Sequence, residues 1–247
     1  MELVRDADAK VTGSWFGFRK DPETAIQLYH RAAKEFAAKN EWEEAGKAWV
    51  KAAEVEHSRG GSMLSAMTNA SIAFHQAMNG EQFKNCLEVL LNIYILSEQW
   101  ERVGDTFEQI GEFYKDRSNF EKASEAFEKA YAHFKMVKMN KKELRCVKQL
   151  AKTLSLSKKY KEARAIWTKL SGKEAEFGGI LCYMMTTNLD KVKETISFQV
   201  KEKELLSILV RAIETKNFQL FKTAPEAYYL EEWQVVILRE IGEKYFN

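Results

Sequence analysis

The sequence predicts an all-α fold in which helical hairpins stack one after another along the chain. Helix starts recur about every twenty residues between Asp21 and Lys159, and most of them open with an aromatic residue. Two helices therefore fit into a period of about forty residues, which is typical of a helical solenoid. Of the 247 residues, 45% are hydrophobic, 30% are charged and only two are proline. This composition predicts one folded domain without a flexible linker.

Capping signals and apolar spacing predict the first helices. Asp21 stands before Pro22, a favourable N-cap followed by proline at the first helical position. Three further starts, at Asn40, Ser118 and Asn140, have a glutamate three residues later, the spacing of a capping box or its asparagine analogue. The apolar positions of the first two helices alternate small residues with rings: Ala25, Tyr29, Ala32, Ala33, Phe36, then Trp42, Ala45, Gly46, Trp49, Ala52 and Ala53. We expect a ring of one helix to enter the hole that alanine or glycine leaves on the next.

Two helix openings are close to a known repeat pattern. Trp42-x-x-Ala45-Gly46-x-x-Trp49 and Trp100-x-x-Val103-Gly104-x-x-Phe107 are similar to the start of the tetratricopeptide repeat. After Leu170 the regularity fades, although segments 173–186, 201–215 and 231–245 still have helical patterns. We predict a right-handed, tetratricopeptide-like α-solenoid in a single domain spanning 1–247. Residues 1–170 would form the hairpin repeats, and residues 171–247 would form a helical bundle that caps them.

The net charge of +2 conceals a strongly basic segment. From Lys135 to Lys173 there are thirteen lysines and arginines but only two acidic residues, and such a field attracts an acidic partner. Four of these cations occupy i, i+4, i+7 and i+11 of one predicted helix: Lys141, Arg145, Lys148 and Lys152. The buried stripe of this helix is expected to consist of Leu144, Val147, Ala151 and Leu154. We interpret the basic face as a surface for an acidic protein, the alternative being a merely solvated face.

The chain shows no pattern that indicates catalysis. Gly60-Gly61-Ser62 follows a predicted helix and lacks the lysine of a phosphate-binding loop. The four histidines lack zinc-ligand spacing, and the three cysteines fall in apolar helical patterns that indicate reduced core residues. We expect no enzyme, no cofactor and no metal. Nucleic acid is not expected either, because the basic segment has few aromatics and no known motif.

An aromatic cluster precedes the first capped helix. Trp15, Phe16 and Phe18 surround Gly17, and Arg19 and Lys20 follow. Exposed rings beside cations suit insertion into the interface of a membrane with anionic lipids. The alternative is a hydrophobic staple packed on the first helix. No apolar stretch is long enough to span a bilayer and charged residues interrupt the start of the chain, so we expect a cytoplasmic protein that is peripheral on membranes.

The block from Ala25 to Phe36, followed by Trp42, Ala45-Gly46 and Ala52-Ala53 and preceded by the glycine-flanked aromatic loop, resembles a known family. These residues are similar to the soluble NSF attachment proteins, the SNAP adaptors, and more to the alpha/beta type than to the gamma type. Further similar positions lie nearer the C-terminus: Tyr160 to Trp167, Leu181-Cys182 and Leu230-Glu231-Glu232-Trp233.

The resemblance implies an adaptor. Several copies of a SNAP wrap a four-helix SNARE bundle and present it to the ATPase NSF, which takes it apart during vesicle fusion and intracellular protein transport. It implies a membrane contact through Trp15, Phe16 and Phe18. Together with the basic helix face, it implies a SNARE-binding set of Lys141, Arg145, Lys148, Lys152, Lys173 and Lys201. The acidic residues implied to face NSF are Glu214, Glu231 and Glu232.

The sequence departs from the family at two points that affect the implied function. One lysine expected to face the SNARE bundle is replaced by Asp105, and the family's acidic tail ending in leucine has no match after Asn247. The stimulation of the ATPase that this tail provides is therefore not implied here. We predict a non-catalytic adaptor that bridges SNARE complexes to an NSF-type AAA ATPase. The alternative is a generic tetratricopeptide-like scaffold that binds another acidic protein or an RNA.

Overall fold

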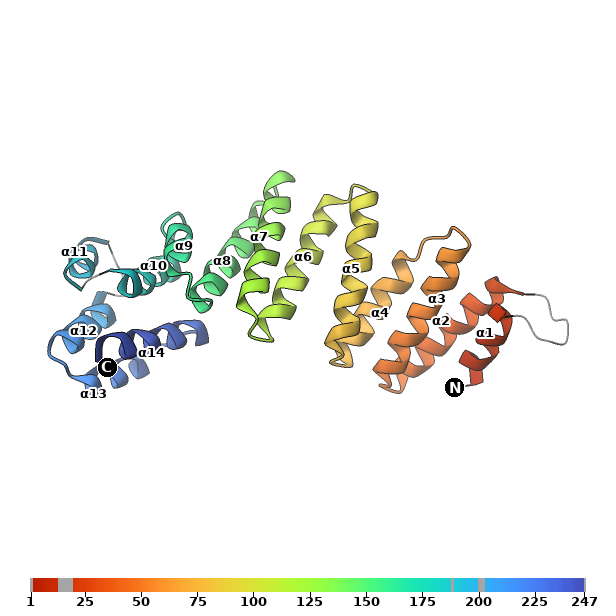
Figure 1. Ribbon diagram of the computed structural model, residues 1–247, viewed down its shortest axis with the longest axis horizontal. Coiled ribbons are helices and arrows are strands. Elements are labelled where there is room, and N and C mark those ends of the chain that lie inside the picture. Colours follow the sequence, from red (N-terminus) through yellow and green to blue (C-terminus); the bar gives the residue numbers. More distant parts are fainter. Residues whose placement is uncertain (1, 13–19, 188, 200–202, 247) are drawn as a thin grey trace. The chain divides into compact units, whose positions relative to one another are not determined.

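The computed structural model of the protein describes residues 2–12, 20–187, 189–199 and 203–246. In these ranges the chain forms α-helices and no strand (Figure 1), which confirms the predicted all-α class. The helices fall into two compact units, Met1–Phe113 and Tyr114–Asn247. The interpretation of the chain as one domain stays a prediction.

Helices of the first unit pack against their neighbours in chain order. They are α1 (Glu2–Thr12), α2 (Pro22–Ala38), α3 (Trp42–Ser58), α4 (Leu64–Gln76) and α5 (Gly80–Leu96), and α6 (Trp100–Lys115) leads into the second unit. All five predicted apolar positions of α2 are buried, as are those of α3 from Ala45 to Ala53. A Cβ atom on Gly46 of α3 would lie only 2.7 Å from the ring of Phe74 in α4. This contact confirms that a small residue makes the hole for a neighbouring ring.

Eight of the described turns between helices share one backbone conformation. One residue in each is left-handed, with a positive φ: Asn40, Gly60, Met78, Glu98, Ser118, Lys138, Lys158 and Lys216. The N–H of the next residue donates to the carbonyl five residues earlier, as from Glu41 to Phe36 at 2.9 Å and from Asn119 to Tyr114 at 2.9 Å. This is the Schellman motif, which satisfies carbonyls that a helix end would leave unpaired. The same turn after helices of similar length produces the period of about twenty residues.

The capping predictions are confirmed at one start and wrong at three. The Asp21 carboxylate accepts a hydrogen bond from the Thr24 N–H at 3.1 Å. Asn40 and Ser118, by contrast, are the left-handed residues of their turns, and the N-caps are Glu41 and Asn119. Asn140 already lies in the helix that follows. The reason is the turn itself, because the left-handed residue must stand one position before the cap.

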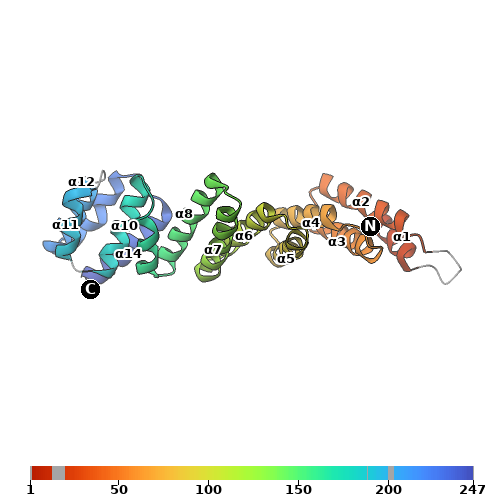
Figure 2. The same cartoon turned by 90° about the horizontal axis from the view of Figure 1, so that it is seen from above.

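The second unit contains the remaining helices. They are α7 (Phe120–Met136), α8 (Asn140–Leu156), α9 (Tyr160–Trp167), α10 (Lys173–Thr186), α11 (Leu189–Gln199), α12 (Lys203–Glu214), α13 (Phe218–Thr223), the short 3₁₀ helix η1 (Ala224–Ala227) and α14 (Glu232–Phe246). Helices α7 and α8 lie side by side as a hairpin in both views (Figures 1 and 2). The sequence predicted α10, α12 and α14 to within a few residues, whereas α11 and α13 were missed.

One continuous core joins α8 to α14. At its centre the ring of Trp167 is 1% exposed and stacks on Trp233, with ring centroids 5.3 Å apart and an interplanar angle of 13°. Gly178 lets both rings approach, since a Cβ there would lie 2.9 Å from each. The predicted C-terminal helical bundle is therefore present, and its core includes residues as early as Ala151. None of the described helices combines the length and apolar character that crossing a bilayer requires.

Candidate functional site

Helix α8 carries the basic face that the sequence predicts. The helix packs against α7, α9 and α14, and Lys141 and Arg145 near its start are exposed. The predicted buried stripe is correct at Ala151 but wrong at Leu144, which is 48% exposed. The residues buried on this helix are Cys146, Leu150, Ala151, Thr153 and Ser155. The buried side is thus rotated from the predicted one, because α8 packs against three other helices, α7, α9 and α14.

Two lysines of this face are held by acidic residues of other helices. Glu174 in the first turn of α10 accepts from Lys148 Nζ at 3.0 Å and pairs with Lys152 Nζ at 2.6 Å. Lys152 Nζ also donates to Glu231, just before α14, at 2.7 Å. The same Glu231 oxygen accepts the indole N–H of Trp233 at 3.1 Å. This ion-pair network, Lys148–Glu174–Lys152–Glu231, links α8 to α10 and α14.

The network keeps its central members charged despite their burial. The side chain of Lys152 is only 18% exposed and that of Glu174 only 25%. Burial by itself would raise the pKa of Glu174, but hydrogen bonds from Lys152 and Lys148 outweigh it and lower that pKa. Burial would likewise lower the pKa of Lys152, and its bonds to Glu174 and Glu231 raise it instead. Both groups are therefore ionised at neutral pH, and an incoming acidic partner would compete with Glu174 and Glu231 for these lysines.

The comparisons with known proteins agree with this architecture. The model of a protein family described as soluble NSF attachment protein, SNAP, matches residues 1–245 of the chain. The chain belongs to this family. It is thus a helical adaptor of the SNAP type, and the resemblance stated from its sequence is confirmed. A comparison of this SNAP-family chain with curated proteins found no match.

A solved structure supports the fold. It is a signal-transduction ATPase with numerous domains (STAND) that carries a tetratricopeptide-repeat sensor, from Pyrococcus horikoshii. The alignment has a TM-score of 0.53 and 16% identity, and it covers 99% of the SNAP-family chain but 41% of the other. At this identity the likeness shows the fold alone, which is a tetratricopeptide-like solenoid. The SNAP-family chain spans less than half the length of that protein.

The other predicted site residues of this SNAP-family adaptor are distributed over several helices. Lys173 is the exposed first residue of α10. Glu214 ends α12 and forms an ion pair with Lys193 of α11, and Glu232 is exposed at the start of α14. Lys201 and the aromatic residues Trp15, Phe16 and Phe18 lie outside the described residues. The structure brings together Lys148, Lys152 and Glu231, which were predicted to serve two different partners.

Sequence reasoning missed Glu174. The signal for it in the sequence is an acidic residue in the first turn of α10, directly after the basic segment. Acidic residues are common in first turns, however, because the positive end of the helix dipole stabilises them. Only the packing of α10 beside α8 shows that this acid faces two lysines. The same packing gives Trp233 a second role, since its ring stacks in the core while its N–H holds Glu231.

The cysteines of the adaptor and one of its histidines, His30, lie in the packing of the helices, whereas His57 and His75 are exposed. His30 faces Glu56 at 3.4 Å and packs on Trp49 with ring centroids 4.8 Å apart, and burial lowers its pKa. All three cysteines are buried and free, as expected for core residues, and burial raises the pKa of Cys86 to about 11. Among the described residues no group of three possible metal ligands comes together.

Proposed function

We propose that this SNAP-family adaptor binds an assembled four-helix SNARE bundle through the basic face of α8 and recruits an NSF-type AAA ATPase to it. The observation that carries the proposal is the family match over residues 1–245. The excess of cations between Lys135 and Lys173 supports it, because the surface of such a bundle is largely acidic. The adaptor itself performs no chemistry in this proposal.

Charge on α8 supplies attraction and orientation. Lys141 and Arg145 are exposed and would make the first contacts with acidic side chains of the bundle. Lys148 and Lys152 are already paired with Glu174, so they contribute less unless that pairing opens. Contacts between exposed charges are screened by salt, so the affinity is expected to fall as ionic strength rises. Lys173 and Lys201 would extend the surface toward the C-terminus.

The proposal includes two further contacts. Trp15, Phe16 and Phe18 would touch the membrane as a peripheral anchor, and this weak contact would raise the effective concentration of the adaptor near membrane-bound SNAREs. Glu214, Glu231 and Glu232 would face the ATPase. Because Glu231 also holds Lys152, the surface for the bundle and the surface for the ATPase would share one ion pair.

A binding assay with a preassembled SNARE bundle tests the proposal. Lys141→Glu combined with Arg145→Glu should weaken binding about tenfold or more, since each exposed ion pair contributes up to about 1 kcal/mol and reversal adds repulsion. The matched control is Lys34→Glu with Lys39→Glu, which makes the same change of charge at two exposed residues outside the basic segment. Affinity is measured at several salt concentrations.

Equal affinity of the two double variants would contradict the proposed surface. Binding of a generic acidic protein or an RNA with the same affinity as the SNARE bundle would favour the general scaffold instead. Liposome co-sedimentation tests the anchor separately: replacing Trp15, Phe16 and Phe18 by serine should reduce binding to anionic vesicles and leave binding to the bundle in solution unchanged.

A further inference from the structure

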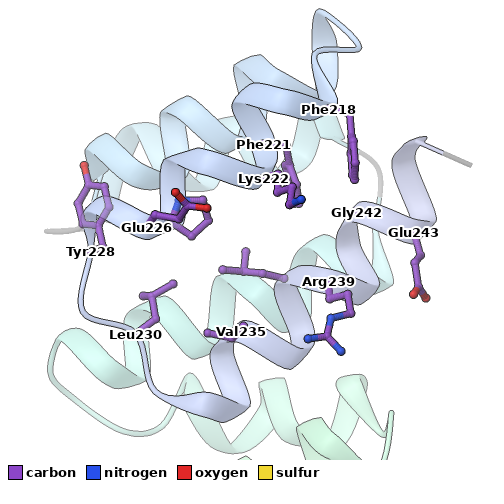
Figure 3. A pocket seen from close by; sticks show the side chains of 12 residues that line it. Phe218, Phe221, Lys222, Glu226, Tyr228, Leu230, Val235, Arg239, Gly242 and Glu243 are labelled. Carbon is purple, nitrogen blue, oxygen red and sulfur yellow. The ribbon is translucent and has the colours of Figure 1, made fainter.

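An open apolar groove lies between the last two helical segments of the second unit. One wall is formed by α13 and η1, the other by α14, and the segment that connects them closes one end at Tyr228 and Leu230 (Figure 3). The groove has a volume of about 640 Å³. Among the described residues, none that is assigned to the SNARE bundle or to the ATPase lines it. It is therefore a feature that the proposed function does not use.

The two walls have the same residue spacing. The first contributes positions i, i+3, i+4, i+7 and i+8: Phe218, Phe221, Lys222, Pro225 and Glu226. The second contributes the same positions: Val235, Leu238, Arg239, Gly242 and Glu243. Such a stripe is the face that a helix normally buries against another helix. Two such stripes that line one groove form a surface on which a third helix can pack, as a helix of the next hairpin does in a continuing solenoid.

The groove exposes apolar surface. Phe218 is 53% exposed and Val235 is 43% exposed, while Phe221 and Leu238 beneath them are buried. The walls are in contact at the end away from Tyr228, where a Cβ on Gly242 would lie 3.2 Å from the Phe221 ring. Apolar residues that are exposed on both walls of one groove indicate an interaction site more often than a singly exposed residue does.

Charges on the rim follow the same pattern on both walls. On each wall, position i+4 is a cation and position i+8 is an acid. These residues are Lys222 and Glu226 on the first wall and Arg239 and Glu243 on the second. Because the start of α13 lies against the end of α14, the walls are antiparallel. The two cations therefore fall near the middle of the groove and the acids toward opposite ends (Figure 3). Among the described residues none of the four forms an ion pair with an oppositely charged side chain.

The charges on the rim restrict which partner can fit the groove. A second copy of the chain, docked about a two-fold axis through the groove, would place cations against cations. A fatty acid would find cations for its carboxylate but an acid at each end of the rim. A helix with acidic residues at its middle and basic residues at its ends complements all four charges. The nine residues of α14 from Val235 to Glu243 span eight rises of about 1.5 Å, or about 12 Å, which matches about two turns of such a helix.

We propose that this groove binds one amphipathic α-helix of a partner protein, whose apolar stripe enters between α13 and α14. Acidic residues beside the middle of that stripe would meet Lys222 and Arg239, and basic residues at its ends would meet Glu226 and Glu243. This is helix-in-groove recognition, with apolar anchors at i, i+3 or i+4, and i+7. The site is separate from the basic face of α8 and does not depend on the proposed function.

Two synthetic peptides of equal composition test the proposal on the full chain. Each is an amphipathic helix of about 18 residues with the same leucine stripe; one has glutamates in the middle and lysines at the ends, and the other has the reverse. Fluorescence anisotropy should show that the wild type binds the glutamate-centred peptide about tenfold more tightly or better. Lys222→Glu with Arg239→Glu should reverse this preference, because the middle of the groove becomes acidic.

Two further variants serve as controls. Arg211→Glu with Lys161→Glu makes the same change of charge at exposed residues that do not line the groove, and it should keep the wild-type preference. Val235→Lys places a charge on the exposed apolar part of the α14 wall and should weaken the binding of both peptides. All the substituted residues are exposed, and circular dichroism checks that each variant folds.

Three outcomes would overturn the proposal. They are the absence of binding to either peptide, equal binding of both, and a preference that the Lys222 and Arg239 variant does not reverse. A fluorescent fatty acid is measured in parallel. If it binds and is lost in Val235→Lys while neither peptide binds, the groove is a lipid site and the helix proposal is wrong. Because no SNARE or ATPase enters this assay, its failure leaves the proposed function untouched.

Discussion

Helices α2–α4 and the core around Trp167 bury their apolar side chains in different ways. In α2–α4 the helices approach closely through small residues, with Ala45, Ala52 and Ala53 fully buried and the Phe74 ring set against Gly46. Around Trp167 large side chains from α8 to α14 fill one continuous cluster. The first arrangement uses neighbours in sequence, and the second brings together residues far apart in the chain.

This difference explains where the sequence is easy to interpret. When each helix buries its face only against the next, the apolar spacing repeats and the period is visible. In a core with partners from seven helices, each helix faces several directions and no period survives. The regularity therefore fades after Leu170 although the packing does not become poorer.

The largest expected effect comes from Trp167→Ala. The ring is buried and stacked on Trp233, so its removal should cost about 3–5 kcal/mol of the free energy of unfolding. Urea unfolding followed by circular dichroism measures this loss. Hydrogen exchange should increase in α9, α10 and α14 together, because all three pack around this ring. Tyr229→Ala, at a fully exposed ring of the same unit, is the control and should change stability by less than about 0.5 kcal/mol. Exchange that increases in α9 alone would show that the shared core is not cooperative.

A smaller effect, about 1–3 kcal/mol, is expected for Gly46→Ala. The added methyl group would lie 2.7–2.8 Å from three carbons of the Phe74 ring, and overpacking of this kind is destabilising. Hydrogen exchange should increase mainly in α3 and α4. Phe74→Leu should restore part of the loss in a double-mutant cycle. Gly179→Ala is the matched control, since its methyl group would meet only Trp167 Cβ at 3.5 Å. An equal loss in both alanine variants would mean that the cost is not due to the Phe74 contact.

The smallest effects are expected in the turns, and their sign depends on whether glycine is introduced or removed at the left-handed position. Lys138 is exposed and has a φ of 57°, so Lys138→Gly should stabilise the protein by about 0.5–1 kcal/mol after the entropy cost of glycine is subtracted. Gly60 has a φ of 73° and free space around it, so Gly60→Ala should cost about 1 kcal/mol through the backbone alone. Thermal unfolding of both variants measures the pair. The same sign for both would show that the two turns are not equivalent.

The basic face of α8 could be predicted from the sequence only in part. Its four cations lie on one helix at the predicted spacing, and Lys141 and Arg145 are exposed. The partners Glu174 and Glu231 could not be predicted, because spacing within a helix says nothing about which acid of another helix will face it. The groove between α13 and α14 was missed for a related reason, since α13 is a helix of six residues, too short to show a period.

The sequence by itself determined the helical class, the family, the approximate period and the buried faces of α2 and α3. These follow from local physics, since the 3.6-residue spacing and the alternation of small residues with rings are properties of neighbouring residues. Tertiary structure decided that α8 turns Leu144 outward and that Lys152 is shared by Glu174 and Glu231. Each of these depends on where one helix packs on another, and the free energy of that packing belongs to pairs of distant segments rather than to either segment alone.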